Sequence, residues 1–330
     1  MDERRERELV LDAIQSAFIL DKTKGNIIVY VGPHKTSLSG TDEPVVFESD
    51  SRSFKSSTIE KAVSQFVSAD EGSYVVLENP AERDDPADRP WRRNQELAGR
   101  IPAGWQKGRT DREATLALLH TLRKGMEDDA CDKAVELLNS GAGAQSIWDA
   151  LFLGSAELVV RQPGIVALHA ATTTNAFHYC YQAAGDDAIR RLILLQNAAF
   201  LPMFRQAMAG RGNVGEFVID EWEPAEGGNV QGIFEAIHRD SMKAARMTLA
   251  YFEDRGAVRP WVEESRRLVV QKGSSVHDYK FAMAAIEDAE KISPEWLGRY
   301  LAASTFLLQG SGKGDNPLIQ KAAAILKDST

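Results

Sequence analysis

Residues 164–181 read GIVALHAATTTNAFHYCY, a stretch of eighteen positions without a charged side chain. A helix with this sequence is apolar on nearly every side, so the stretch predicts a helix at the centre of a helical bundle. Six polar side chains interrupt the apolar positions: His169, Thr172, Thr173, Thr174, Asn175 and His178. Because buried polar groups need hydrogen-bond partners, their concentration here indicates chemistry as well as packing.

The two histidines of this stretch are nine residues apart, which places them about half a turn out of phase on one helix. One straight helix therefore cannot direct both at a single ligand. His169 shares a face with Thr172 and Thr173, whereas His178 shares the other with Thr174 and Asn175. Two interpretations remain open: a polar cavity against one face, or hydroxyls bonded back to helix carbonyls and histidines bonded to neighbouring helices.

Helical patterns extend outward from this stretch over residues 111–330. Asp111 and Asp129 are typical starts of two helices, because aspartate accepts hydrogen bonds from the free amides there. Further helices are predicted, between glycine and proline breaks, over 144–161, 165–183, 186–208, 230–254, 259–271, 275–291, 294–309 and 316–327. This part of the chain is predicted to be one large all-α domain.

Residues 1–80 have a different pattern, with short β-branched runs separated by turn-forming residues. Strands are predicted at 26–31, 45–47 and 74–77, and Ser57 is predicted to begin one short helix. Residues 81–110 are dense in proline and charge, which is typical of a linker. The sequence thus predicts an α+β protein: a small β-rich N-terminal module, a linker and the all-α domain over 111–330.

The composition excludes several functional classes. The chain has 330 residues, a net charge of −9 and 43% hydrophobic residues, which is ample for a buried core. An acidic chain is poorly suited to a phosphate backbone, so no nucleic-acid partner is expected. No apolar run approaches the about 20 residues of a membrane span, and the charged N-terminus lacks the apolar region of a signal peptide. We therefore expect a cytoplasmic protein without a membrane partner.

A second candidate site lies at Glu235-Ala-Ile-His238, an E-x-x-H unit like those of carboxylate-bridged di-iron bundles. On a continuous helix over 230–254, His238 shares an inward face with Phe234 and Ala245. A di-iron site needs a second such unit, and the sequence has none. Glu235 and His238 are therefore either metal ligands or a solvent-facing acid beside a core histidine.

A third candidate begins a helix at Ser275-Val-His277-Asp-Tyr-Lys280-Phe281. His277 is suited to general-base catalysis or to holding a substrate oxygen, and Lys280 to stabilising developing negative charge. The alternative interpretation is ordinary helix capping beside a surface lysine. The stretch 210–215 spells the G-x-G-x-x-G pattern, but no strand precedes it, so it does not predict a dinucleotide-binding site.

The helical region resembles the questin oxidase-like family over about residues 130–310, in the stretches 161–172, 175–177 and 276–281. The resemblance implies a helical enzyme that opens an anthraquinone-type ring by Baeyer–Villiger-type oxygenation with the reduced nicotinamide NADPH. His169 and Thr172 match the histidine–threonine motif of the family. His277, Lys280 and Phe281 match its later motif.

The N-terminal part departs from that family, whose usual N-terminal helices have no counterpart here. Residues 7–80 instead resemble the repeat of bacterial major-vault-protein-like chains, in the stretches 24–38 and 41–47. This second resemblance implies an assembly or scaffold role through self-association of the N-terminal module.

Two functions are therefore predicted from the sequence. The first is an oxidoreductase that oxygenates a small aromatic or polyketide-like ketone in a histidine-lined helical cavity. Its predicted catalytic residues are His169, His178, His238, His277 and Lys280, and its predicted substrate-binding residues are Thr172, Thr173, Asn175 and Phe281. The alternative is a non-enzymatic scaffold protein that assembles through the vault-like module.

Overall fold

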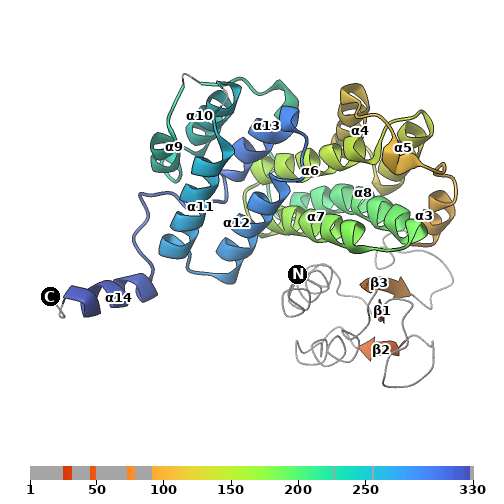
Figure 1. Ribbon diagram of the computed structural model, residues 1–330, viewed down its shortest axis with the longest axis horizontal. Coiled ribbons are helices and arrows are strands. Elements are labelled where there is room, and N and C mark those ends of the chain that lie inside the picture. The colour runs from red at the N-terminus through yellow and green to blue at the C-terminus, as the bar shows by residue number, and fades with distance from the viewer. Residues whose placement is uncertain are drawn as a thin grey trace. The chain divides into compact units, whose positions relative to one another are not determined.

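A computed structural model describes the backbone of residues 25–31, 45–49 and 73–78, and residues 91–225, 227–254 and 256–327. The first three ranges are strands: β1 (Gly25–Val31), β2 (Val45–Ser49) and β3 (Ser73–Glu78). They form an antiparallel sheet in the order β2-β1-β3 (Figure 1). In its register, Ile27 pairs with both Phe47 and Leu77.

These strands cover three of the runs predicted to be extended, where β-branched residues favour a pleated backbone. The helix predicted to begin at Ser57, and the resemblance to a vault-like repeat, lie largely outside the described residues. The β-rich module as a whole therefore stays a prediction.

From Trp91 onward the described residues are all-helical, as the sequence predicts for most of this range. The first six α-helices are α3 (Trp91–Ala98), α4 (Arg112–Lys124), α5 (Glu127–Asn139), α6 (Ala144–Arg161), α7 (Ile165–Ala183) and α8 (Asp187–Ala209). Six more follow: α9 (Val230–Ala236), α10 (Ser241–Glu253), α11 (Val258–Lys272), α12 (Val276–Asp288), α13 (Pro294–Ser304) and α14 (Pro317–Lys327). Two short 3₁₀ helices, η1 (Trp105–Lys107) and η2 (Ile219–Glu221), lie between them (Figure 1).

Local capping explains where several of these helices begin. The side chain of Asp111 accepts hydrogen bonds from the amides of Glu113 and Ala114, as predicted for the start of α4. The start of α5 differs from the prediction: Glu127 begins the helix, and Asp129 lies inside its first turn. There the Asp129 carboxylate accepts from the Met126 amide at 2.8 Å, so it caps the helix from within rather than preceding it.

The predicted helix over 230–254 is broken into α9 and α10. His238 lies in the break with a left-handed backbone, φ 74°, a conformation that a continuous right-handed helix does not contain. Asp240 then begins α10, because its carboxylate accepts from the Lys243 amide at 2.9 Å. The apolar periodicity of the sequence continues across this break, which is why periodicity alone predicts one helix.

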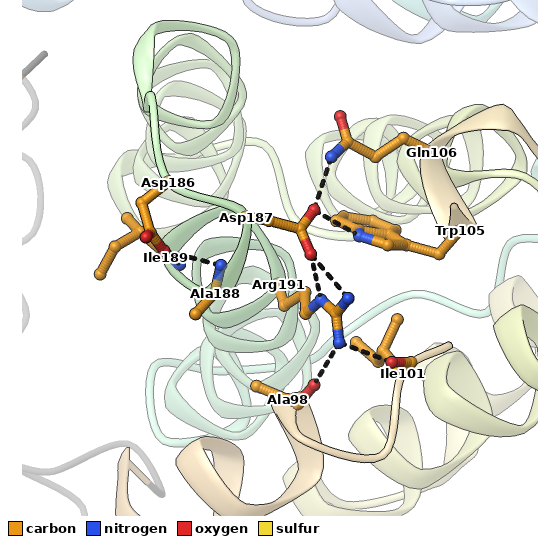
Figure 2. A network of polar contacts seen from close by, with 9 residues as sticks. All are labelled: Ala98, Ile101, Trp105, Gln106, Asp186, Asp187, Ala188, Ile189 and Arg191. Atoms are coloured by element: carbon orange, nitrogen blue, oxygen red, sulfur yellow. Dashed lines mark hydrogen bonds and ion pairs between the residues drawn. The ribbon is translucent and has the colours of Figure 1, made fainter. Parts of the chain in front are cut away.

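The linker predicted over 81–110 is folded in its second half. Trp91, Leu97 and Trp105 are buried in this region, where charge and proline content alone indicate a solvated segment. Figure 2 shows how it is held: the Asp187 carboxylate accepts from Trp105 Nε1 at 2.9 Å, while Arg191 donates to the Ala98 carbonyl at 3.2 Å. Bonds from a charged group to buried backbone are among the stronger hydrogen bonds in proteins.

The chain divides into two compact units. The first unit comprises residues 1–148 and 176–203, and the second comprises 149–175 and 204–330. Each of α6, α7 and α8 therefore contributes residues to both units. No helix in the described ranges is both long and apolar enough to cross a membrane.

Candidate acid–base site on α7 and α12

Two histidines distant in sequence meet in the second unit. The ring of His169 on α7 lies edge-on to the ring of His277, in the first turn of α12, with centroids 5.5 Å apart. His169 is 5% exposed. Its Nδ1 atom is buried without a hydrogen-bond partner in the part of the chain that the structure describes. Such an atom is costly to leave without a partner, so its presence indicates a site for another group.

Positive charge surrounds His169. The pKa of its imidazole is lowered to about 4, mainly by burial and in addition by electrostatic repulsion from His277, Lys280 and Arg211. Lys280 lies three residues after His277, so both side chains project from the same face of α12. His169 is consequently neutral near pH 7, and an uncharged imidazole can accept a proton.

Arg211 is a residue that the sequence analysis missed. It lies just after α8, in a loop fixed against the end of α6. There Gln162 Nε2 donates to the carbonyls of Met208 and Asn213, at 3.3 and 3.1 Å, and the Gly215 amide donates to the Arg161 carbonyl at 2.8 Å. The charge of Arg211 acts on the pKa of His169, so the loop brings this arginine into the neighbourhood of His169. The signal in the sequence is an arginine within the glycine-rich stretch 210–215.

The sequence leaves two interpretations open for the threonines of α7: a polar cavity, or hydroxyls bonded back to helix carbonyls. Different threonines fit different interpretations. The Thr174 hydroxyl donates to the Ala170 carbonyl at 3.0 Å, and the Thr172 hydroxyl lies 3.5 Å from the His169 carbonyl. These are bonds back to the helix itself. The Thr173 hydroxyl is buried and has no hydrogen-bond partner among the described residues. Thr173 is therefore the threonine available to a ligand.

Asn175 belongs to a buried network at the other end of α12. Its Nδ2 atom donates to Asp288 Oδ1 at 2.8 Å and lies 3.3 Å from Glu287 Oε2. The Tyr300 hydroxyl donates to Asp288 Oδ2 at 2.7 Å. Burial raises the pKa of Asp288 to about 7, although the bonds from Asn175 and Tyr300 act in the opposite direction. Asn175 thus binds this carboxyl group, a role that the sequence did not predict.

Phe281, predicted to contact substrate, is 2% exposed on α12. It is one turn beyond His277, with the buried residues that hold α12 in the second unit. The structure therefore gives Phe281 a packing role in positioning the helix that carries His277 and Lys280.

His178 lies in the first unit, in an aromatic cluster. Its ring is 4.8 Å from that of Trp148 in an edge-on arrangement, and 5.9 Å from that of Tyr181. Trp105 contacts Tyr181 at 5.9 Å and extends the cluster. Edge-on aromatic pairs stabilise a core beyond the area that they bury, so the geometry gives His178 a packing role.

His238 and Glu235 differ from the arrangement predicted for metal ligands. Both are exposed, and His238 follows the end of α9 instead of lying on an inward helix face. Its Nε2 atom accepts a hydrogen bond from the Gly310 amide at 3.2 Å, which ties the break between α9 and α10 to the segment before α14. Within the described ranges, no three or more histidine, cysteine, aspartate or glutamate residues form a group able to hold a metal ion.

Comparisons with known proteins do not identify a family for this chain. The chain matches no protein-family model, and searches of the curated proteins and of the solved structures find no match.

Proposed function

We propose that the helical part of the chain is an oxidoreductase that oxygenates an aromatic or polyketide-like ketone at the site of His169 and His277. The observation that carries this proposal is the meeting of these two imidazoles, 5.5 Å apart, beside Lys280. These are also the residues through which the sequence resembles the questin oxidase-like family.

The chemistry of the site suits the attack of an oxidant on a carbonyl carbon. Neutral His169 is able to accept a proton from a peroxide-type oxidant or from an acidic hydroxyl of the substrate. The negative charge that then develops on the carbonyl oxygen is stabilised by the positive charges of Lys280 and Arg211. Thr173 supplies a hydroxyl on the same helix face as His169.

NADPH, which the resemblance implies, does not have a recognisable site here. The G-x-G-x-x-G stretch at 210–215 follows α8 rather than a strand, so it does not present amides at the edge of a parallel sheet as dinucleotide-binding folds do. We therefore assign no residue to NADPH and no step to it.

The test uses the full chain with a hydroxyanthraquinone, NADPH and oxygen-18 gas. The expected result is a ring-opened product that carries one oxygen-18 atom, with one NADPH oxidised per product. We expect His169→Ala to lower the rate by about 100-fold or more, since it removes the proton acceptor. His120→Ala, at an exposed histidine of α4, is the matched control. An unchanged rate in His169→Ala would exclude this role for His169.

A second candidate function is assembly through the N-terminal sheet. Among the described strands, β2 and β3 both lie at an edge, with β1 between them. Edge strands are templates for pairing with another chain. Size-exclusion chromatography over a range of concentrations should then show a large species for the full chain that is absent without residues 1–80. A monomer at every concentration would contradict the scaffold function.

A further inference from the structure

Helix α14 exposes an apolar side. Leu318 is 75% exposed and Leu326 is 69% exposed, and both lie with Ala322 on one side of this helix of eleven residues. Isolated helices of this length are marginal in water, and most helices in proteins are stabilised by packing an amphipathic face. An exposed apolar side on so short a helix therefore indicates a partner surface.

The first turn of α14 is fixed to the end of α11. Asn316 is buried, its amide donates to the Gln271 carbonyl at 2.8 Å, and its Nδ2 atom donates to the Val270 carbonyl at 2.7 Å. Its Oδ1 atom also accepts from the amides of Leu318 and Ile319, both at 3.1 Å, and so caps α14. Figure 1 shows α14 extending from this point away from α11 and α12. The helix thus has a set direction, and the described part of the chain does not cover its apolar side.

Helix α12 carries a second exposed apolar surface, which we call the α12 stripe and define as Val276, Tyr279 and Met283. Val276 is 60% exposed, and Tyr279 and Met283 are each 40% exposed. Their spacing of three and four residues places them on one side of α12. The Tyr279 hydroxyl donates to the Gly273 carbonyl at 3.0 Å, which fixes its ring on this surface. The stripe is therefore a rigid apolar surface open to a partner.

The apolar side of α14 and the α12 stripe match in length and in charge. The eleven residues of α14 span about 16 Å, and α12 spans about 10 Å from Val276 to Met283. Glu287 continues the stripe one turn further, and Glu290 follows it as an exposed acid. On α14, Lys321 is exposed and no acidic residue is present. Opposite charges beside an apolar contact favour docking and set its orientation.

We propose that α14 of one copy docks on the α12 stripe of a second copy, in a reciprocal exchange that gives a two-fold symmetric dimer. Each copy supplies one apolar helix and one apolar stripe, so the contacts close in pairs and leave neither surface exposed. The contact buries few side chains, so the dimer is weak, with a Kd on the order of 10–100 µM. At about 1 µM the chain is monomeric, and there α14 does not contribute to the stability of the fold. The inference does not depend on the proposed oxidoreductase.

Sedimentation velocity of the full chain between about 1 and 300 µM should show a monomer converting to a dimer. We expect Leu326→Glu in α14 and Met283→Glu in the α12 stripe each to raise the Kd by about tenfold or more, because each places a charge in an apolar contact. Ala324→Glu on the opposite side of α14, and Met242→Glu at an equally exposed methionine of α10, are the matched controls and should leave the Kd unchanged. A monomer at every concentration, or equal effects of all four substitutions, would overturn the proposal.

Cross-linking between copies identifies the two surfaces. We expect a short bis-maleimide reagent to link Ala322→Cys of one copy to Met283→Cys of another in an equal mixture. Wild type gives the background from Cys131 and Cys180, and Ala324→Cys mixed with Met283→Cys is the control on the opposite side of α14. Linking of Ala322→Cys to itself would show that two α14 helices pair with each other, and would overturn the exchange.

Two other forms of association are distinguished by the same variants. If the chain stays monomeric and sediments with anionic phospholipid vesicles, and Leu326→Glu abolishes this, the occupant of α14 is a lipid surface and the dimer is excluded. Assembly through the N-terminal sheet would persist in Leu326→Glu and in Met283→Glu. Self-association that neither substitution weakens would therefore overturn the docking of α14.

Discussion

At the residue scale, two buried titratable groups of the second unit act on stability in opposite directions. The pKa of Asp288 is raised to about 7 and that of His169 is lowered to about 4. Between pH 3.8 and about 7, the folded protein holds a proton on Asp288 that the unfolded chain has lost. Between about pH 4 and 6.5, the folded protein lacks a proton on His169 that the unfolded chain binds. Stability therefore falls with rising pH through Asp288 and rises with pH through His169.

The first prediction concerns Asp288. Its raised pKa contributes to the free energy of unfolding, and this contribution is complete below the ordinary pKa of 3.8 and is lost as pH rises toward about 7. In Asp288→Asn the amide keeps an acceptor for Asn175 and cannot ionise, so this loss disappears. We expect wild type to lose stability relative to Asp288→Asn by up to about 1.4 kcal/mol per pH unit between pH 5 and 7. Urea denaturation at several pH values measures the stability of both proteins. Parallel curves of stability against pH for wild type and Asp288→Asn would contradict this prediction.

The second prediction concerns His169, with the opposite sign. Its lowered pKa contributes to the free energy of unfolding. This contribution is present above the ordinary histidine pKa of 6.5 and is lost as pH falls toward about 4. In wild type the two effects oppose each other over this range, so the overall pH dependence from these groups is small. We expect His169→Gln to expose the Asp288 effect, with stability that falls as pH rises from 5 to 7. The same urea series tests this, and wild-type and His169→Gln curves that run parallel between pH 4 and 6.5 would exclude the lowered pKa.

At the element scale, α8 fixes the segment that precedes α4. Arg191 is paired with Asp187 at 2.6 Å and donates to the carbonyls of Ala98 and Ile101 (Figure 2). We predict that Arg191→Gln destabilises the protein by about 1–3 kcal/mol, because buried carbonyls lose charged donors. Hydrogen exchange should quicken between Ala98 and Lys107. Lys124→Gln, at the end of α4, is the control, and equal exchange in both variants would contradict this clamp.

The same scale shows what the sequence could and could not predict. The bounds of α6 and α7 are predictable because glycine and proline interrupt long apolar patterns on either side. The break at His238 is not predictable, because it depends on a left-handed residue that lacks a glycine signal. The pairing of His169 with His277 follows from the packing of α7 and α12, which no spacing along the chain encodes. Arg211 and Asp288 were missed for the same reason.

At the scale of the whole molecule, three helices join the two compact units. Because α6, α7 and α8 each contribute residues to both units, neither core can lose these helices without the other being affected. We therefore predict one cooperative unfolding transition instead of two. Calorimetry of the full chain checks this prediction. Tryptophan fluorescence is a second measurement, because Trp105 and Trp148 lie in the first unit and Trp261 and Trp296 lie in the second.

A proline in α7 provides the decisive variant. Ala176 is the first residue of the first unit within α7, and proline there removes a hydrogen bond of the helix interior, at a cost of about 3 kcal/mol or more. If unfolding is cooperative across the units, Ala176→Pro lowers the melting temperature seen by the tryptophans of both units equally. Removing residues 317–330 is the control, because α14 is exposed along almost its whole length and should leave both signals unchanged. A shift confined to Trp105 and Trp148 would show that the two units unfold independently, and the site of His169 and His277 would then be stabilised by the second unit alone.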